Sequence, residues 1–247
     1  MPQAASIDRE DVARFSAQAA DWWNPEGSFR PLHRLNPIRL GYVRDQICNH
    51  FSRNPASRSS LQKLKMLDVG CGGGLLTEPL ARLGGEMTGL DASAEAIAVA
   101  KKHAAVSDLA IHYQTGSVEA LAAGKARFDV ITALEIVEHV ADMASFVAAL
   151  GRLLRPNGLL IMSTLNRTPH SFLLGIVAAE YVLGWVPKGT HEWRKFVRPS
   201  ELVRQLELQK LTTSDLTGLV FNPLRNEFQL SRTDLKVNYL LTASKKL

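Results

Sequence analysis

The sequence has few cysteines, no long uncharged hydrophobic run and only a small excess of positive charge. Its two cysteines, Cys48 and Cys71, cannot form a disulfide framework, so we expect a reducing compartment. No uncharged stretch reaches the roughly 18 residues of a transmembrane candidate. The acidic run Asp8–Asp11 is unlike a secretory signal or a transit peptide, and we therefore expect a cytoplasmic protein.

The composition is that of an ordinary globular protein. Hydrophobic residues make up 46% of the 247 residues and charged residues 21%, which favours one sizeable core over a disordered chain. The net charge of +5 favours anionic partners, which include lipid headgroups, nucleic acid and acidic substrates. The charge alone does not choose among these three classes.

Residues 66–74 are the most informative stretch, in which a hydrophobic run leads to Asp68 and then to glycines at alternate positions. This pattern predicts a strand that turns sharply into a helix, because glycine allows strained dihedral angles and a close approach to a ligand. A second predicted strand, 86–91, ends in Asp91, about 20 residues after Gly70, where a ribose-binding acid belongs. The two features predict a nucleoside site at the switch point of an open α/β sheet.

The glycine spacing excludes two common nucleotide-binding loops. The dinucleotide fingerprint G-x-G-x-x-G fails, because Leu75 or Thr77 stands where its third glycine should be. No lysine follows the glycines as in an NTP-binding P-loop, so we expect a nucleoside without a pyrophosphate. The observed pattern, Asp-x-Gly-x-Gly-x-Gly over residues 68–74, resembles the first motif of the seven-stranded S-adenosylmethionine-dependent methyltransferases.

Hydrophobic periodicity predicts strands that alternate with helices, which favours a doubly wound, Rossmann-like α/β fold with a seven-stranded, mostly parallel sheet. We expect an amino-terminal helical extension over residues 1–60 and a methyltransferase domain over 61–247, with an insertion at about 166–198. The predicted strands are 64–69, 86–91, 109–114, 128–133, 158–163, 211–217 and an antiparallel 236–243. The predicted helices are 7–20, 37–51, 75–83, 93–104, 117–123, 142–155 and 199–208.

Within the insertion, residues 171–187 are apolar almost throughout, and Glu180 is their only charge. The segment is too short to span a bilayer, but it contains Trp185 and is flanked by basic residues, as interfacial elements are. We expect either a contact with anionic membrane lipids or a lid over the active site, and one segment could serve both purposes. The first alternative implies peripheral association with the inner membrane.

The fourth predicted strand leads into Leu134, which we expect to line an adenosine pocket, and then into Glu135, Glu138 and His139. These three side chains could hold a divalent cation such as Mg²⁺. Alternatively, His139 and Glu138 could supply a general base, since an imidazole with a pKa of about 6.5 suits proton removal at neutral pH. A third interpretation is a surface helix start, where the helix dipole favours acids.

Several further blocks of the chain are similar to one family, the ubiquinone biosynthesis O-methyltransferases. They are spread over nearly the whole chain, whereas the glycine motif alone indicates only the superfamily. The blocks are 22–25 (WWNP), 31–39 (PLHRLNPIR), 134–140 (LEIVEHV), 163–167 (STLNR), 186–191 (VPKGTH), 217–219 (TGL) and 237–239 (VNY).

The resemblance implies two O-methylations, of 2-polyprenyl-6-hydroxyphenol and of 3-demethylubiquinol, with S-adenosylmethionine as the methyl donor. A polyprenylated phenol or quinol stays in the bilayer, so the implied partners are anionic lipids at 171–187 and other enzymes of ubiquinone biosynthesis. Nucleic acid is not expected, because the basic residues are scattered rather than gathered with aromatic ones. The alternatives are another methyltransferase of this class, acting on a small phenol or on RNA, and a binding module without turnover.

The implied cofactor site combines acids, glycines and one arginine. Asp91 would accept the ribose hydroxyls, Asp68 would order the loop and the methionine ammonium group, and Arg39 would pair with the methionine carboxylate. Gly70 and Gly72 would let the backbone approach the cofactor. The positions that match cofactor-binding residues of the family are Arg39, Gly70, Asp91 and Leu134. The metal role of Glu135, Glu138 and His139 resembles that in the eukaryotic members.

Overall fold

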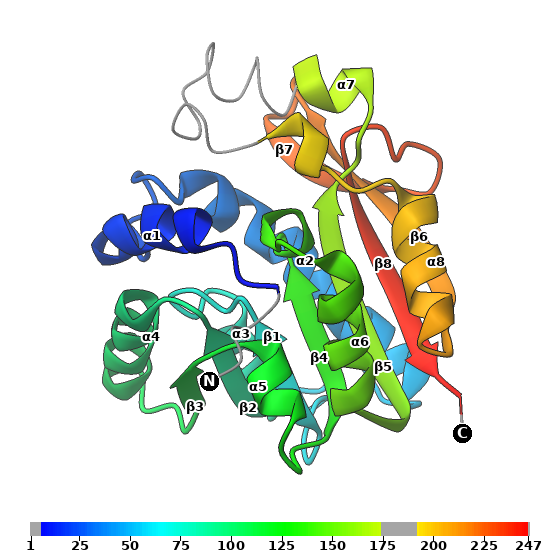
Figure 1. The fold of residues 1–247 in the computed structure, drawn as a ribbon. Coiled ribbons are helices and arrows are strands. Elements are labelled where there is room, and N and C mark those ends of the chain that lie inside the picture. The colour runs from blue at the N-terminus through cyan, green and yellow to red at the C-terminus, as the bar shows by residue number, and fades with distance from the viewer. Residues whose placement is uncertain (1–5, 174–191, 247) are drawn as a thin grey trace.

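One twisted sheet of eight strands runs through the computed structural model, which describes residues 6–173 and 192–246 (Figure 1). The strands are β1 Lys65–Val69, β2 Glu86–Asp91, β3 His112–Thr115, β4 Phe128–Leu134, β5 Leu154–Leu165, β6 Leu211–Asn222, β7 Glu227–Ser231 and β8 Asn238–Lys245. Their order along the sheet is β3-β2-β1-β4-β5-β8-β6-β7. Neighbours from β3 to β5 are parallel, and those from β5 to β7 are antiparallel.

The predicted α/β class with a mostly parallel sheet is confirmed, but the number of strands differs. The described residues contain eight strands rather than seven, because β7 forms a hairpin with β6 that sets Gly218 opposite Ser231. All five residues of β7 are exposed or half-buried. Their sequence, Glu-Phe-Gln-Leu-Ser, does alternate polar and apolar side chains, so the pattern of a half-buried strand was present and the prediction overlooked it.

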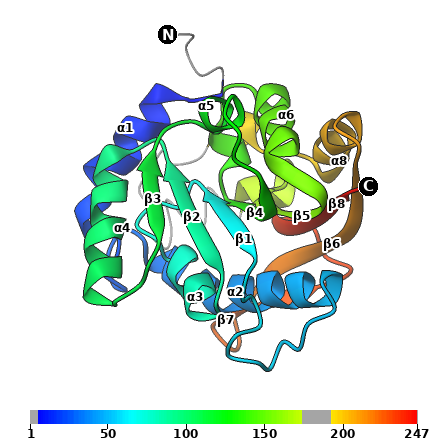
Figure 2. The ribbon, with the colours of Figure 1, turned by 90° about the horizontal axis from the view of Figure 1, so that it is seen from below.

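Helices cover both faces of the sheet. They are α1 Arg9–Ala17, η1 Ala19–Asp21, α2 Arg30–His50, α3 Thr77–Arg82, α4 Ala94–Val106, α5 Val118–Ala122, η2 Val137–His139, α6 Met143–Leu153, α7 Pro169–Ser171, η4 Trp193–Lys195 and α8 Pro199–Leu208. Figure 2 shows α2 and α3 along one face and α5, α6 and α8 along the other, with α4 beside β3. In such doubly wound sheets, ligands bind at the carboxyl ends of the strands.

Helix α2 begins seven residues before residue 37, where the sequence predicted its start, so that predicted start was wrong. Pro31 occupies the first turn instead, where the missing N–H has no helical partner to lose. Pro37 lies inside the helix and removes one backbone hydrogen bond. The helix continues because later residues on its inner face, Val43 and Ile47, are fully buried against the sheet.

The amino-terminal segment packs on the loops that follow β1 and β4. Ile7 forms an isolated antiparallel bridge with Val140, just after η2. Further along, the indole N–H of Trp23 donates to the carbonyl oxygen of Gly73 at 2.9 Å. Trp22 and Leu75 belong to one buried apolar cluster. The expected extension thus holds α1, η1 and α2, while the division of the chain at residue 60 stays a prediction.

The apolar stretch 171–187 lies almost entirely outside the described residues, and so does the prediction that it is a lid or a lipid contact. Its first three residues are described, and two of them, Phe172 and Leu173, are 45% and 56% exposed. Across residues 6–173 and 192–246, no helix combines the length and the apolar character needed to cross a membrane.

Candidate functional site

A cavity lies at the carboxyl ends of β1, β2 and β4, beside the amino-terminal segment. Two predicted site residues, Gly72 and Glu138, do not line it. The amino-terminal segment supplies side chains that include Asp11, Val12 and Phe15. The predicted site residues that line the cavity are Arg39, Asp68, Gly70, Asp91, Leu134, Glu135 and His139.

The glycine turn after β1 has the left-handed backbone that its sequence predicted. Gly70 and Gly72 have φ angles of +70° and +52°, a region that side chains disfavour. A Cβ atom on Gly72 would overlap the ring of Trp22, and one on Gly70 would lie 2.9 Å from the side chain of Ile136. Both positions therefore require glycine, Gly72 for packing and Gly70 for space beside the cavity.

Asp91, at the end of β2, is fixed by the backbone on two sides. Its Oδ2 accepts the N–H of Gly72 and its Oδ1 accepts the N–H of Ser93, both at 2.8 Å. Burial raises the pKa of this carboxyl, and the backbone N–H groups of Ser93, Gly72 and Ala92 oppose that shift. Gly72 thus positions Asp91 rather than lining the cavity itself, and a carboxylate, which has about four lone-pair sites, can still accept a hydrogen bond from a ligand.

Asp68 and Arg39 also line the cavity, as an oppositely charged pair. Asp68 accepts the hydroxyls of Thr77 at 2.6 Å and Thr132 at 2.7 Å. Burial nevertheless raises the pKa of Asp68 to about 6. Arg39 is 5% exposed, and its Nε has no hydrogen-bond partner among the described residues. A buried donor without a partner costs about 1–3 kcal/mol, so the cavity beside Arg39 favours an anionic ligand group.

Glu135 and Glu138 have separate partners rather than a common centre. Glu135 accepts the Ser163 hydroxyl at 2.5 Å and the Asn238 amide at 3.0 Å. Glu138 accepts the Thr164 hydroxyl at 2.8 Å. Burial and the charge of Glu135 raise the pKa of Glu138 to about 7. Consecutive residues of a 3₁₀-helix point about 120° apart, which explains why His139 lines the cavity and Glu138 does not.

The predicted divalent-cation site does not fit this arrangement. The three proposed ligands have different hydrogen-bond partners, which are Ser163 for Glu135, Thr164 for Glu138 and Asp11 for His139. Across the described ranges, no group of three His, Cys, Asp or Glu side chains could hold a metal ion. The predicted metal role of Glu135, Glu138 and His139 is therefore not supported.

His139 contacts a residue that sequence reasoning missed. Its Nδ1 lies 3.2 Å from Oδ2 of Asp11, which is 128 residues away in the sequence. Burial lowers the pKa of His139, while the neighbouring Glu138 charge opposes that shift. The imidazole is therefore neutral at neutral pH and able to accept a proton. Nothing in the local sequence around Asp11 signals this contact, because it depends on how the amino-terminal segment folds back.

The methyltransferase domain family matches residues 67–162, which contain the glycine turn, Asp91 and His139. A ubiquinone biosynthesis O-methyltransferase from Sinorhizobium fredii is 48% identical over 242 residues, which cover 98% of this chain and 97% of that protein. One from Bartonella quintana is 50% identical over 240 residues, which cover 97% of each chain. The chain belongs to the ubiquinone biosynthesis O-methyltransferases.

This O-methyltransferase shares its fold with more distant solved structures. Magnesium protoporphyrin IX methyltransferase from Synechocystis PCC 6803, solved with bound S-adenosylhomocysteine, matches with a TM-score of 0.61 at 18% identity, over 96% of this chain and 94% of that chain. The PH0226 protein from Pyrococcus horikoshii matches with a TM-score of 0.61 at 17% identity, over 92% of this chain and 95% of that chain. Family and fold together make the chain an S-adenosylmethionine-dependent methyltransferase.

The charged side chains that line the cavity of this O-methyltransferase fit S-adenosylmethionine. The donor on Arg39 Nε suits the methionine carboxylate, and the carboxylate of Asp91, which lines the cavity, suits the ribose hydroxyls. Asp68 offers a carboxylate to the ammonium group beside Arg39. The three polar groups thus match the charges and hydroxyls of the cofactor.

Proposed function

We propose that this protein transfers a methyl group from S-adenosylmethionine to ring hydroxyls of polyprenylated intermediates in ubiquinone biosynthesis. The acceptors are 2-polyprenyl-6-hydroxyphenol and 3-demethylubiquinol. The observation that carries the proposal is that Arg39, Asp91 and His139 line one cavity in a chain of this family. An arginine for the carboxylate, an acid for the ribose and a base for the acceptor are what such a transfer needs.

The chain's own residues bind and orient the cofactor. Arg39 binds the methionine carboxylate, Asp68 the ammonium group, and Asp91 the ribose hydroxyls. Gly70 leaves room for the cofactor beside Ile136, and Leu134 lines the adenosine pocket. When bound, S-adenosylmethionine supplies an electrophilic methyl group on a sulfonium. Holding it beside the acceptor converts a bimolecular reaction into an effectively unimolecular one.

His139 is the general base in this proposal. A phenol has a pKa of about 10, so transfer to its oxygen is faster when a base takes the proton. The lowered pKa of His139 keeps its imidazole neutral and ready for that proton at neutral pH. Glu138 does not line the cavity, and its ionised form favours the imidazolium that forms. Its role is thus electrostatic rather than direct.

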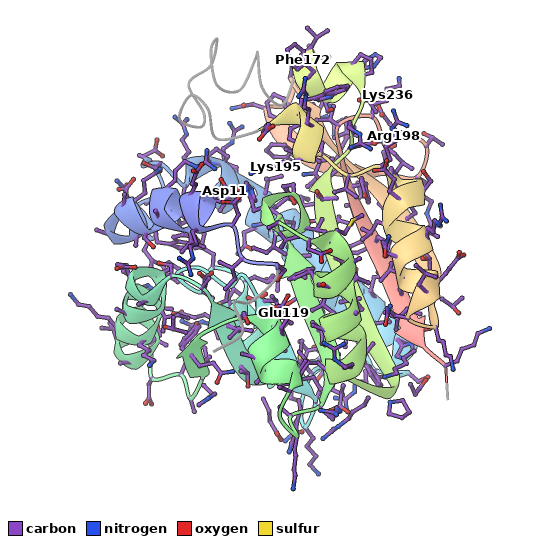
Figure 3. The ribbon with its side chains drawn as sticks, viewed as in Figure 1. Asp11, Glu119, Phe172, Lys195, Arg198 and Lys236 are labelled. Atoms are coloured by element: carbon purple, nitrogen blue, oxygen red, sulfur yellow. The ribbon has the colours of Figure 1, made fainter. Side chains whose placement is uncertain are left out.

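Anionic membrane lipids are the partner that this substrate class requires, because a polyprenyl chain stays in the bilayer. Exposed Phe172 and Leu173 lie at the edge of the apolar stretch, and Figure 3 places Phe172 at the same end of the molecule as Lys236 and Arg198. Exposed apolar side chains beside cations favour a lipid surface. We propose that this end of the molecule meets the membrane as a peripheral contact.

A methyl-transfer assay tests the proposed activity. Purified protein is incubated with S-adenosylmethionine and a short-chain prenylated catechol, and mass spectrometry follows the methyl ether and S-adenosylhomocysteine. We expect both products in equal amounts, with no competition from RNA. Binding of the cofactor without any methyl ether would instead indicate a binding module, and methylated RNA would indicate a nucleic-acid methyltransferase.

A further inference from the structure

Asp11 and His139 meet at the edge of the cavity, and their contact has a defined direction. The ring nitrogen Nδ1 and the carboxylate Oδ2 are 3.2 Å apart, and both side chains are largely buried. An ionised carboxylate has no proton to donate, so the ring nitrogen is the donor. The contact therefore selects the imidazole tautomer with its proton on Nδ1 and its basic lone pair on Nε2.

Two cationic side chains hold the Asp11 carboxylate in place. The ammonium group of Lys195, on η4, lies 3.5 Å from Oδ2 of Asp11 and 2.8 Å from Oδ2 of Asp8 (Figure 3). Arg14, one turn further along α1, forms an ion pair with Oδ1 of Asp11. Because both oxygens have charged partners, the carboxylate that faces His139 is fixed in orientation.

The orientation of the imidazole ring is fixed from the same helix. Phe15 lies four residues after Asp11 and so on the same face of α1. Its ring meets that of His139 edge to face, with centroids 5.2 Å apart and an interplanar angle of 88°. The bridge between Ile7 and Val140 ties the backbone of the two segments together. One helix thus supplies both a hydrogen-bond acceptor and a packing surface for one imidazole.

We propose that Asp11 is the positioning residue of the transfer reaction, which fixes the tautomer and orientation of His139. This inference rests on the proposed role of His139 as the base. The acceptor's hydroxyl proton moves to Nε2, the acceptor oxygen bonds to the methyl carbon, and the carbon–sulfur bond breaks with its electron pair left on sulfur. Asp11 stays ionised throughout and stabilises the positive charge that the imidazole gains, as carboxylates do in comparable triads.

The alternative is that Asp11 is only an anchor for α1, and steady-state kinetics separates the two roles. We expect Asp11→Asn to lower kcat on the order of 100-fold while the KM for S-adenosylmethionine changes less than about threefold. Glu10→Gln is the matched control, because Glu10 is an exposed neighbour on the same helix, and it should change neither constant. Asp11→Asn with an unchanged kcat would overturn the inference.

A double-mutant comparison makes the kinetic test sharper. If Asp11 acts through His139, adding Asp11→Asn to His139→Gln should cause no further loss of kcat. An equal loss in both backgrounds would show an anchoring role instead and contradict the inference. Thermal unfolding of each variant accompanies the kinetics, so that a folding defect is seen as such.

Nitrogen NMR tests the same contact in the unaltered protein, and so does not depend on how a variant folds. The long-range ¹H–¹⁵N signals of His139 are those missing from the His139→Gln spectrum. We expect Nδ1 to be protonated and Nε2 to be unprotonated in the neutral ring, and the reverse tautomer would refute the role of Asp11. If His139→Gln kept full turnover, His139 would not be the general base, whichever tautomer the NMR spectrum showed. If Asp11→Asn kept full turnover and His139→Gln did not, the role of His139 would stand and the role of Asp11 would be refuted.

Discussion

The backbone N–H of Gly72 donates to Oδ2 of Asp91 at 2.8 Å, and this bond joins the turn after β1 to the acid at the end of β2. The two features that the sequence shows as separate motifs are therefore one structural unit. Any change that moves the turn also moves the carboxylate that we assign to the ribose hydroxyls.

We expect Gly72→Ala to weaken binding of S-adenosylhomocysteine by at least about tenfold and to destabilise the protein by about 1–3 kcal/mol. The cause is the φ angle of +52° and the overlap of a new Cβ with Trp22. Calorimetric titration and urea unfolding measure the two effects. Gly41→Ala is the control, because Gly41 lies in α2 with open space around it. Gly41→Ala should gain about 0.5–1 kcal/mol of stability and keep its affinity for S-adenosylhomocysteine. If the two variants changed in stability and affinity alike, this account would be contradicted.

Arg39→Met should change stability and affinity in opposite directions. Without ligand, removing a buried guanidinium whose Nε has no partner among the described residues should leave the free energy of unfolding unchanged or raise it. Binding of S-adenosylhomocysteine should weaken by about 2–5 kcal/mol, because the carboxylate loses its charged partner.

A ligand without the carboxylate provides the control for Arg39. Methylthioadenosine has the adenosine but no amino-acid part, so wild type and Arg39→Met should bind it equally. If the variant lost affinity for both ligands alike, Arg39 would have a general structural role and not the one assigned to it.

Asp68 makes stability depend on pH in a definite direction. Its pKa is about 6 in the folded protein and about 3.9 in an unfolded chain, so the folded state binds this proton more tightly. This contribution to the free energy of unfolding is fully present below about pH 4 and is lost as the pH rises through about 6. The total loss is about 3 kcal/mol. Between pH 4.5 and 7.5, Asp68→Asn should therefore gain about 2 kcal/mol of stability relative to wild type, which is the part of the total that falls within this range. Urea unfolding at both pH values checks this, and a difference that does not change with pH would refute it.

The exposed pair Phe172 and Leu173 should contribute to lipid binding. Replacing both by serine should reduce co-sedimentation with anionic vesicles, because their apolar area no longer enters the interface. Val106→Ser is the matched control, since Val106 is an exposed apolar residue at the end of α4. Unchanged sedimentation of the double variant, or an equal loss in the control, would reject this surface.

Local patterns predicted the parallel strands of the sheet well. β2 has the predicted bounds, and β1 begins one residue after its predicted start, because each is a hydrophobic run that ends at the turn or the acid of the cofactor site. β3 begins three residues later than predicted. There, the turn ends at Asp108, which has a φ of +51°, and the apolar residues 109–111 lie in the loop before the strand. A hydrophobic run shows that a strand is near, whereas its bounds depend on the neighbouring strand.

The sequence predicted the cofactor-binding residues of the candidate site well, but it did not predict the residues around His139, the proposed general base. Asp68, Gly70 and Asp91 carry a local motif with a fixed spacing, and the structure places all three at one cavity. The residues that surround His139 come from far away in the sequence, Asp11 from α1 and Lys195 from η4. Such long-range contacts leave no periodic trace in a single sequence.

Calorimetric titration of the unaltered protein with S-adenosylhomocysteine tests the central claim most directly, since every assignment above depends on a sulfonium-nucleoside site at the glycine turn. We expect a single site with a dissociation constant between about 1 µM and 1 mM, the range of ordinary enzyme ligands, and no heat with NAD or ATP. No heat with S-adenosylhomocysteine, or stronger binding of either of the other two nucleotides, would contradict the account.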